Sequence, residues 1–213
     1  MPEKSASDLS LFLDILQKLE AVGVPYVIIG GFAATIYGIT RATYDIDIIV
    51  DLNEEHIQAL ADAYPLPRYY ADPYQMRNAT QIGSTFNIID VERGEKADLF
   101  PVTMDPRYRP AFENRVRQVV ELPGIEPFAV WAARPEDVIV GKLMAWAELQ
   151  TKRHESDIYE MMVFHYLGLQ PDLDPAFDEG YVDAKALRLG KEVASLWQDL
   201  KTEAQQEANR AQQ

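Results

Sequence analysis

Residues 26–52 read YVIIGGFAATIYGITRATYDIDIIVDL, and most of what the sequence implies about function begins in this segment. It predicts an apolar strand, the Gly30-Gly31 pair, a short helix, and a second strand that carries Asp45 and Asp47. Because alternate residues of a strand share a face, the two aspartates should stand side by side. Two carboxylates this close favour a bound cation, and Mg²⁺ takes oxygen ligands while leaving positions for water and substrate phosphates. The pair therefore predicts a phosphate-handling metal site.

The diglycine supports the same chemistry. Without Cβ atoms, Gly30 and Gly31 let a ligand approach the main chain. The N–H groups at the start of the next segment, residues 32–37, would point toward an anion. This order of strand, diglycine, helix and strand differs from the spacing of a P-loop or of a dinucleotide-binding fingerprint.

Gly30-Gly31 followed by Arg41-x-Thr43-x-Asp45-x-Asp47 resembles the signature of the nucleotidyltransferase superfamily. It is similar in particular to the AbiEii-like and MenT-like branch, which includes toxins of toxin–antitoxin pairs. The resemblance covers roughly residues 24–160.

Three later segments extend this resemblance. The branch places a third carboxylate on a later strand, and GEKADLFPV supplies Asp98. RPEDVIVGKLMAWAE resembles its helix with Glu136 and Asp137 near the start and Lys142 further along. The branch often carries Lys-Asp-x-x-Asp-Ile in its helical half, whereas residues 153–158 of this chain read RHESDI, with His154 in place of the first aspartate. The role of this segment is left open.

The resemblance implies a transfer from a nucleoside triphosphate to a hydroxyl acceptor, with pyrophosphate as the second product. It implies a pair of Mg²⁺ ions held by three catalytic carboxylates, those of Asp45, Asp47 and Asp98. Asp98 would also orient or deprotonate the attacking hydroxyl. It implies that five further residues bind the nucleotide: Gly30, Gly31, Arg41, Thr43 and Lys142.

Each assignment has a structural alternative. The two strand aspartates could be the solvated face of an amphipathic strand, and the diglycine could be a tight turn. Asp98 could simply pair with its neighbour Lys96, and Lys142 could pair with Asp157 between helices. Arg41 could be an ordinary surface side chain. For the remaining candidates we favour a solvated position for the histidines and core packing for the tryptophans: His56, His154, Trp131 and Trp146.

Composition narrows the class of protein. The chain has 213 residues, 47% of them hydrophobic, which predicts a globular protein. Cysteine is absent, so thiol nucleophiles and cysteine-bound zinc are excluded. No apolar run reaches the roughly 18 residues of a membrane helix, and the N-terminus has no signal-peptide core. We therefore expect a cytoplasmic protein with no membrane partner.

The formal net charge of −14 argues against a generally nucleic-acid-coating surface. Residues 101–153 differ from the rest because they carry eight basic and seven acidic residues. A local RNA contact is therefore most plausible in this segment.

The pattern of caps and apolar spacing predicts a mixed α/β fold, with a small sheet flanked by helices and followed by a helical part. We expect a catalytic domain over residues 1–131 and a C-terminal helical domain over residues 132–213. Helices are predicted from an Asp8 cap to Gly23 and over 54–63, 73–82, 135–151, 155–167 and 183–204, with a frayed tail beyond. Strands are predicted over 86–91, 96–102, 116–122 and 127–131.

The sequence leaves three functions open. The first is a metal-dependent nucleotidyltransferase that modifies RNA, such as a tRNA 3′ end, as a toxin with a cognate antitoxin. The second keeps the chemistry but uses a small molecule such as an aminoglycoside, or a protein, as acceptor; the acidic surface would suit a cationic acceptor. The third is a nucleotide-binding module without catalysis.

Overall fold

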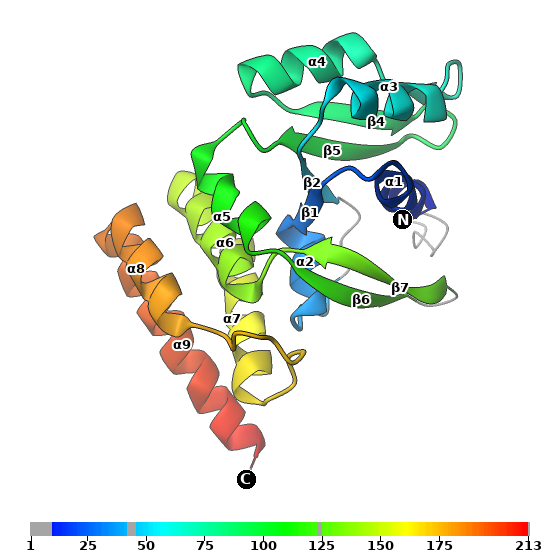
Figure 1. Ribbon diagram of the computed structural model, residues 1–213. Helices are drawn as coiled ribbons and strands as arrows, with labels where there is room; N and C mark the ends of the chain where they lie inside the picture. The colour runs from blue at the N-terminus through cyan, green and yellow to red at the C-terminus, as the bar shows by residue number, and fades with distance from the viewer. Residues whose placement is uncertain (1–9, 42–45, 123–124, 213) are drawn as a thin grey trace. The chain divides into compact units, whose positions relative to one another are not determined.

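The computed structural model describes residues 10–41, 46–122 and 125–212 (Figure 1). Asp8, Thr43 and Asp45 therefore lie outside the described residues. The chain divides into two compact units. The first comprises the described residues of Met1–Phe32 and Thr43–Ala133, and the second those of Ala33–Ala42 and Arg134–Gln213. The predicted domain limits of 1–131 and 132–213 stay a prediction. They assign residues 33–42 to the first domain, whereas these residues group with the second unit.

The first unit contains a seven-stranded mixed sheet in the order β3-β4-β5-β2-β1-β7-β6. β2 pairs with β5, and β1 with β7, in parallel, whereas the other neighbouring strands pair antiparallel. Its centre is fully buried, as Ile28, Ile48 and Leu99 show. The strands are β1 (Tyr26–Ile29), β2 (Asp47–Val50), β3 (Tyr69–Tyr70), β4 (Phe86–Asp90), β5 (Glu95–Pro101), β6 (Val116–Leu122) and β7 (Ile125–Ala132).

The helices of the first unit begin and end where the sequence supplies caps. The Asn53 side chain accepts a hydrogen bond from the His56 N–H, and the Asp72 side chain accepts one from the Tyr74 N–H. Gly23 and Gly83 follow the ends of two helices with φ of 74° and 68°, the left-handed region that favours glycine. These helices are α1 (Ser10–Val22), α3 (Glu54–Ala63), α4 (Pro73–Ile82), the 3₁₀ turn η2 (Pro106–Tyr108) and α5 (Arg109–Glu113).

The second unit is helical. α7 contacts α6 and α9, and α8 contacts the same two helices (Figure 1). Leu143, Met161 and Trp197 are fully buried in its core. The helices are α6 (Pro135–Leu149), α7 (Lys152–Tyr166), α8 (Glu179–Leu189) and α9 (Lys191–Ala211). The short α2 (Gly30–Ile36) spans the point at which the first unit passes into the second.

This architecture confirms the predicted mixed α/β fold with a helical C-terminal part. The single helix predicted over residues 183–204 is wrong, because the chain forms α8 and α9 with Gly190, at φ 136°, between them. The frayed tail is also wrong, because α9 continues to Ala211. The short elements β3, η2 and α5 had no sequence prediction. Among the described residues, no helix has the length and apolar character needed to cross a bilayer.

Candidate functional site

A row of polar residues crosses three neighbouring strands of the first unit. Asp47 at the start of β2 lies opposite Asp98 of β5 in the parallel pair. Asp98 in turn lies opposite Asn87 of β4 in the antiparallel pair. Directly opposed residues of a sheet share a face, so these three side chains belong to one face. The structure thus brings together two of the three predicted carboxylates.

The β2 pattern explains why Asp47 reaches this face. Ile46 and Ile48, on either side of it, are buried at 2% and 0% exposure. Asp47 itself is half-buried. The alternation predicted around Asp47 is therefore confirmed, whereas the position of Asp45 relative to it stays a prediction.

Asp98 is already engaged by two side chains. Lys96, two residues earlier on β5, places its Nζ 3.0 Å from both carboxylate oxygens. Asn87 donates from its side-chain amide to Asp98 Oδ1. The Lys96 side chain is 55% exposed and that of Asp98 24% exposed. The pairing that the sequence offered as an alternative role for Asp98 is thus present.

Gly30 lies directly against Asp47. Ile29, the last residue of β1, is the register partner of Asp47, and Gly30 follows it with φ of 66°. A methyl group at Gly30 would lie 2.1 Å from Asp47 Oδ2, which is inside any permitted contact. The position therefore favours glycine for two reasons, its backbone conformation and the space that the Asp47 carboxylate occupies. Gly31 follows in the first turn of α2.

The second unit contains a charged cluster in which two cations share one carboxylate. Arg41 donates from Nε and Nη2 to the two oxygens of Asp157, at 2.7 and 2.6 Å. Lys142 donates to Asp157 Oδ2 at 2.5 Å. Asp157 and Lys142 are buried, at 1% and 5% exposure, whereas the Arg41 side chain remains 30% exposed. The alternative pairing of Lys142 with Asp157 is thus observed, and the sequence did not predict Arg41 as a third member.

Burial and charge act in opposite directions on this cluster. Burial lowers the pKa of Lys142, although the hydrogen bond to Asp157 partly offsets this. Burial alone would raise the pKa of Asp157, but hydrogen bonds from Arg41 and Lys142 outweigh it and hold the pKa below its usual value of 3.8. While all three groups are ionised, the cluster has one more positive than negative charge.

The histidines and tryptophans have mixed environments. His56 accepts the Asn53 N–H in a capping box, so its role is structural. His154 is half-buried, and burial together with nearby Lys142 lowers its pKa, which favours the neutral ring. Trp131 lies under the guanidinium groups of Arg115 and Arg117. Trp146 donates to Glu155. Neither tryptophan is fully buried, so the prediction of core positions is only partly confirmed.

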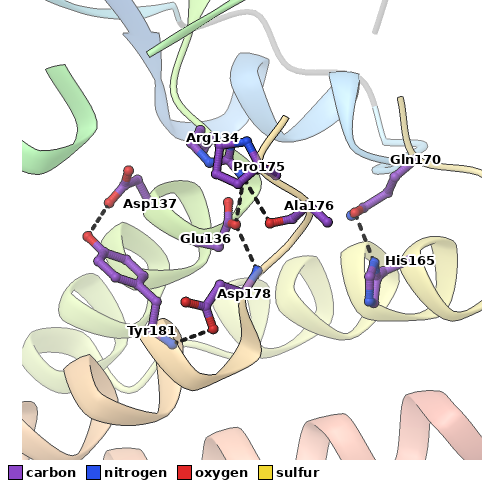
Figure 2. A network of polar contacts seen from close by, with 9 residues as sticks. All are labelled: Arg134, Glu136, Asp137, His165, Gln170, Pro175, Ala176, Asp178 and Tyr181. Carbon is purple, nitrogen blue, oxygen red and sulfur yellow. Dashed lines mark hydrogen bonds and ion pairs between the residues drawn. The ribbon is translucent and has the colours of Figure 1, made fainter. Parts of the chain in front are cut away.

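Figure 2 shows that the polar start of α6 anchors the segment before α8. Arg134 donates to the carbonyl oxygens of Pro175 and Ala176 at 2.6 and 3.2 Å. Glu136 accepts the Asp178 N–H at 2.9 Å. Asp137 likewise accepts the Tyr181 hydroxyl at 2.6 Å (Figure 2). Glu136 and Asp137 therefore join two parts of the helical unit, a role that their favourable position at a helix N-terminus did not reveal.

Two of the three predicted metal ligands, Asp47 and Asp98, lie within the described residues. Within residues 10–41, 46–122 and 125–212, no group of three or more histidine, aspartate or glutamate side chains has a metal-binding arrangement. Asp47 and Asp98 supply two carboxylates in register, and Asp45 lies outside this range.

Comparison with solved structures gives the same fold. A nucleotidyltransferase-like protein from Paracoccidioides brasiliensis is similar with a TM-score of 0.51 and 18% identity, over 92% of this chain and 94% of the other. The antibiotic-resistance factor ANT(2'')-Ia is similar with a TM-score of 0.52 and 14% identity, over 91% and 96% of the two chains. At these identities the likeness concerns the fold alone.

Comparison of sequences identifies the family. No curated protein sequence matches the chain significantly. The family model described as nucleotidyl transferase AbiEii toxin, type IV toxin–antitoxin system, matches residues 14–211, which is nearly the whole chain. The chain therefore belongs to the AbiEii nucleotidyltransferase toxin family.

Proposed function

We propose that this protein is a divalent-metal-dependent enzyme that transfers a nucleotide from a nucleoside triphosphate to a hydroxyl of RNA, such as a tRNA 3′ end. In this role it acts as a cytoplasmic toxin that a cognate antitoxin neutralises. The observation that supports the chemistry best is the register pairing of Asp47 with Asp98 beside Gly30, whose missing side chain makes room for the Asp47 carboxylate.

The donor set fits Mg²⁺. Asp47 and Asp98 present carboxylate oxygens, the ligand type that Mg²⁺ prefers, on adjacent strands. Asp45, two residues before Asp47, is the proposed third ligand. A bound pair of Mg²⁺ ions would supply positive charge that stabilises the transition state of the transfer.

The chain's own groups then have separate tasks. Asp98 orients or deprotonates the acceptor hydroxyl; its carboxylate is partly exposed and is held in place by Asn87. Gly30 and Gly31 allow the triphosphate to approach the backbone. Thr43 offers a hydroxyl to a phosphate oxygen.

The cluster around Asp157 supplies positive charge. Arg41 and Lys142 share the Asp157 carboxylate, so these three groups together carry one excess positive charge that would favour phosphate, although Glu160 also lies close to Arg41. Arg41 is the more exposed of the two cations and is the candidate for direct phosphate contact, while buried Lys142 contributes charge. Asp157 positions both side chains.

The acceptor is inferred from charge. Residues 101–153, with eight basic and seven acidic residues, are the part of the sequence with least repulsion toward RNA. The net charge of −14 favours a cationic acceptor instead, so an aminoglycoside is the second candidate.

The test is a transfer assay with Mg²⁺, each labelled nucleoside triphosphate, and either total RNA or an aminoglycoside. We expect labelled RNA and released pyrophosphate, reduced about a hundredfold or more in Asp47→Asn and Asp98→Asn, as for the loss of other charge-stabilising groups. Exposed Asp199→Asn is the matched control and should transfer normally. Label on the aminoglycoside alone would replace RNA as acceptor, and tight nucleotide binding without pyrophosphate release would favour the non-catalytic module.

A further inference from the structure

The Lys96–Asp98 ion pair lies within the proposed metal site. Lys96 and Asp98 are two residues apart on β5 and therefore share a face of the strand. The ammonium is equidistant, at 3.0 Å, from the two carboxylate oxygens. It thus contacts both of the oxygens that Asp98 could offer to a cation.

The charges around Asp98 explain why a lysine is useful at this point. Asp47 lies opposite Asp98 in the sheet, and like charges directly opposite each other are destabilising. In the absence of metal, the Lys96 ammonium offsets this repulsion. Asn87 holds Asp98 from the neighbouring strand, so the carboxylate keeps its position if Lys96 moves.

The same lysine opposes metal binding. A divalent cation on Asp98 would compete with the ammonium for the same oxygens and would be repelled by its charge. Lys96 has a flexible four-carbon stem and is 55% exposed, so it can leave the carboxylate at small cost.

We propose that Lys96 is a built-in counter-ion that occupies Asp98 in the metal-free protein and is displaced by a divalent cation, so that Lys96 sets the metal affinity of the site. This inference rests on the proposed function, in which Asp98 is a metal ligand. A nucleoside triphosphate brings negative charge that can pair with the displaced ammonium. Metal and nucleotide therefore bind cooperatively, and the cooperativity depends on Lys96.

In the experiment the full chain is titrated with Mn²⁺, and the electron paramagnetic resonance signal of Mn²⁺ reports its binding. The titration is done with and without a non-hydrolysable nucleoside triphosphate. Without nucleotide, Lys96→Met should bind Mn²⁺ about three- to tenfold more tightly than the wild type, the effect of removing one nearby exposed charge. Lys96→Arg keeps the charge and should resemble the wild type, and Asp98→Asn should weaken binding. The nucleotide should increase Mn²⁺ affinity more in the wild type than in Lys96→Met.

Lys152→Met is the matched control. Lys152 is 96% exposed and lies 3.5 Å from Glu155, so its substitution removes a surface charge pair of the same chemistry elsewhere in the chain. It should leave Mn²⁺ affinity unchanged. Thermal unfolding gives a second readout, because saturating Mn²⁺ should raise the melting temperature of Lys96→Met more than that of the wild type.

The outcomes separate the two proposals. If Mn²⁺ binding depends on Asp98 but Lys96→Met behaves like Lys152→Met, the counter-ion role is wrong and the metal-dependent transferase stands. If neither the wild type nor Lys96→Met binds Mn²⁺ at millimolar concentration, with or without nucleotide, both the metal site and the counter-ion role are wrong.

Discussion

Gly30 is the residue at which backbone conformation and site chemistry meet. Gly30→Ala would place a methyl group 2.1 Å from Asp47 Oδ2 at a φ of 66°. Both the left-handed backbone and the contact are unfavourable, so Asp47 must move. We expect the variant to lose nucleotide transfer and Mn²⁺ binding, and to lose more than the roughly 1–2 kcal/mol of stability that the backbone alone explains. Urea denaturation and the transfer assay measure the two effects.

Gly94→Ala is a control at a position with nearly the same φ. Gly94 has φ of 67°, and a methyl group there would meet no atom within 4 Å. Its substitution should cost about 1–2 kcal/mol and leave transfer intact. Equal losses of transfer in Gly30→Ala and Gly94→Ala would mean that the contact with Asp47 does not matter.

The sequence predicted which residues form the candidate site better than it predicted which side chains they contact. Spacing was sufficient to single out Asp47 and Gly30, because strand alternation and a diglycine are local patterns. Arg41 and Asp157 are 116 residues apart, and no local pattern reports that their side chains meet. The pairings of Lys96 with Asp98 and Lys142 with Asp157 were foreseen only as alternatives, since proximity on a strand or on adjacent helices permits a contact without requiring it.

Among the elements, α9 shows how small side chains conceal a buried face. Ala204 and Ala208 are 0% and 1% exposed, on the stripe that also contains Val193, Trp197 and Leu200. Ala204→Leu adds three carbon atoms at a fully buried position, and we expect a loss of about 1–3 kcal/mol in the free energy of unfolding. Exposed Gln205→Leu, the matched control, should change it by no more than about 0.5 kcal/mol. Urea denaturation measures the free energy of unfolding of both variants. Equal stability of the two variants would contradict the close packing of Ala204.

The elements that the sequence located correctly are those with strong local signals. The Asn53 and Asp72 caps fixed the starts of α3 and α4, and the hairpin around Gly94 fixed β4 and β5. The prediction of where α9 ends was wrong because alanine gives little apolar contrast in a polar segment. The end of α9 is stabilised by the contact of this helix with α7, which the local sequence does not report. β3 has only two residues and depends on pairing with β4, so it has no pattern of its own.

For the whole molecule, the parallel pairing of β2 with β5 is the fact that the sequence could not provide. It joins residues about fifty positions apart, and only this pairing places Asp47 beside Asp98. The second unit likewise takes residues 33–42 from the N-terminal half. Gly38 gives an example of a long-range contact within the second unit, because a Cβ there would lie 2.3 Å from the Phe164 ring. Long-range contacts of this kind follow from the complete fold rather than from any segment.

Acid should destabilise the molecule through carboxylates that are paired in the folded state. For Glu20, Asp90, Asp157 and Asp183, burial would raise the pKa, but hydrogen bonds from cationic side chains outweigh it and lower the pKa. In the unfolded chain these groups titrate near 4.5 for glutamate and 3.8 for aspartate, so below these values the unfolded state binds more protons. Stability is therefore fully present above this window and is lost as pH falls through the folded-state pKa values.

Asp157 offers the sharpest form of this prediction because it is the shared partner of Arg41 and Lys142. Asp157→Asn should cost about 3 kcal/mol at pH 7, as expected for breaking a buried ion pair. Since protonation removes the same charge from the wild type, this difference should shrink as pH falls below 3.8. Urea denaturation of both proteins between pH 7 and pH 3 measures it, with exposed Asp199→Asn as a control whose curve should parallel the wild type. A difference that stays constant down to pH 3 would show that the charge of Asp157 does not hold the cluster together.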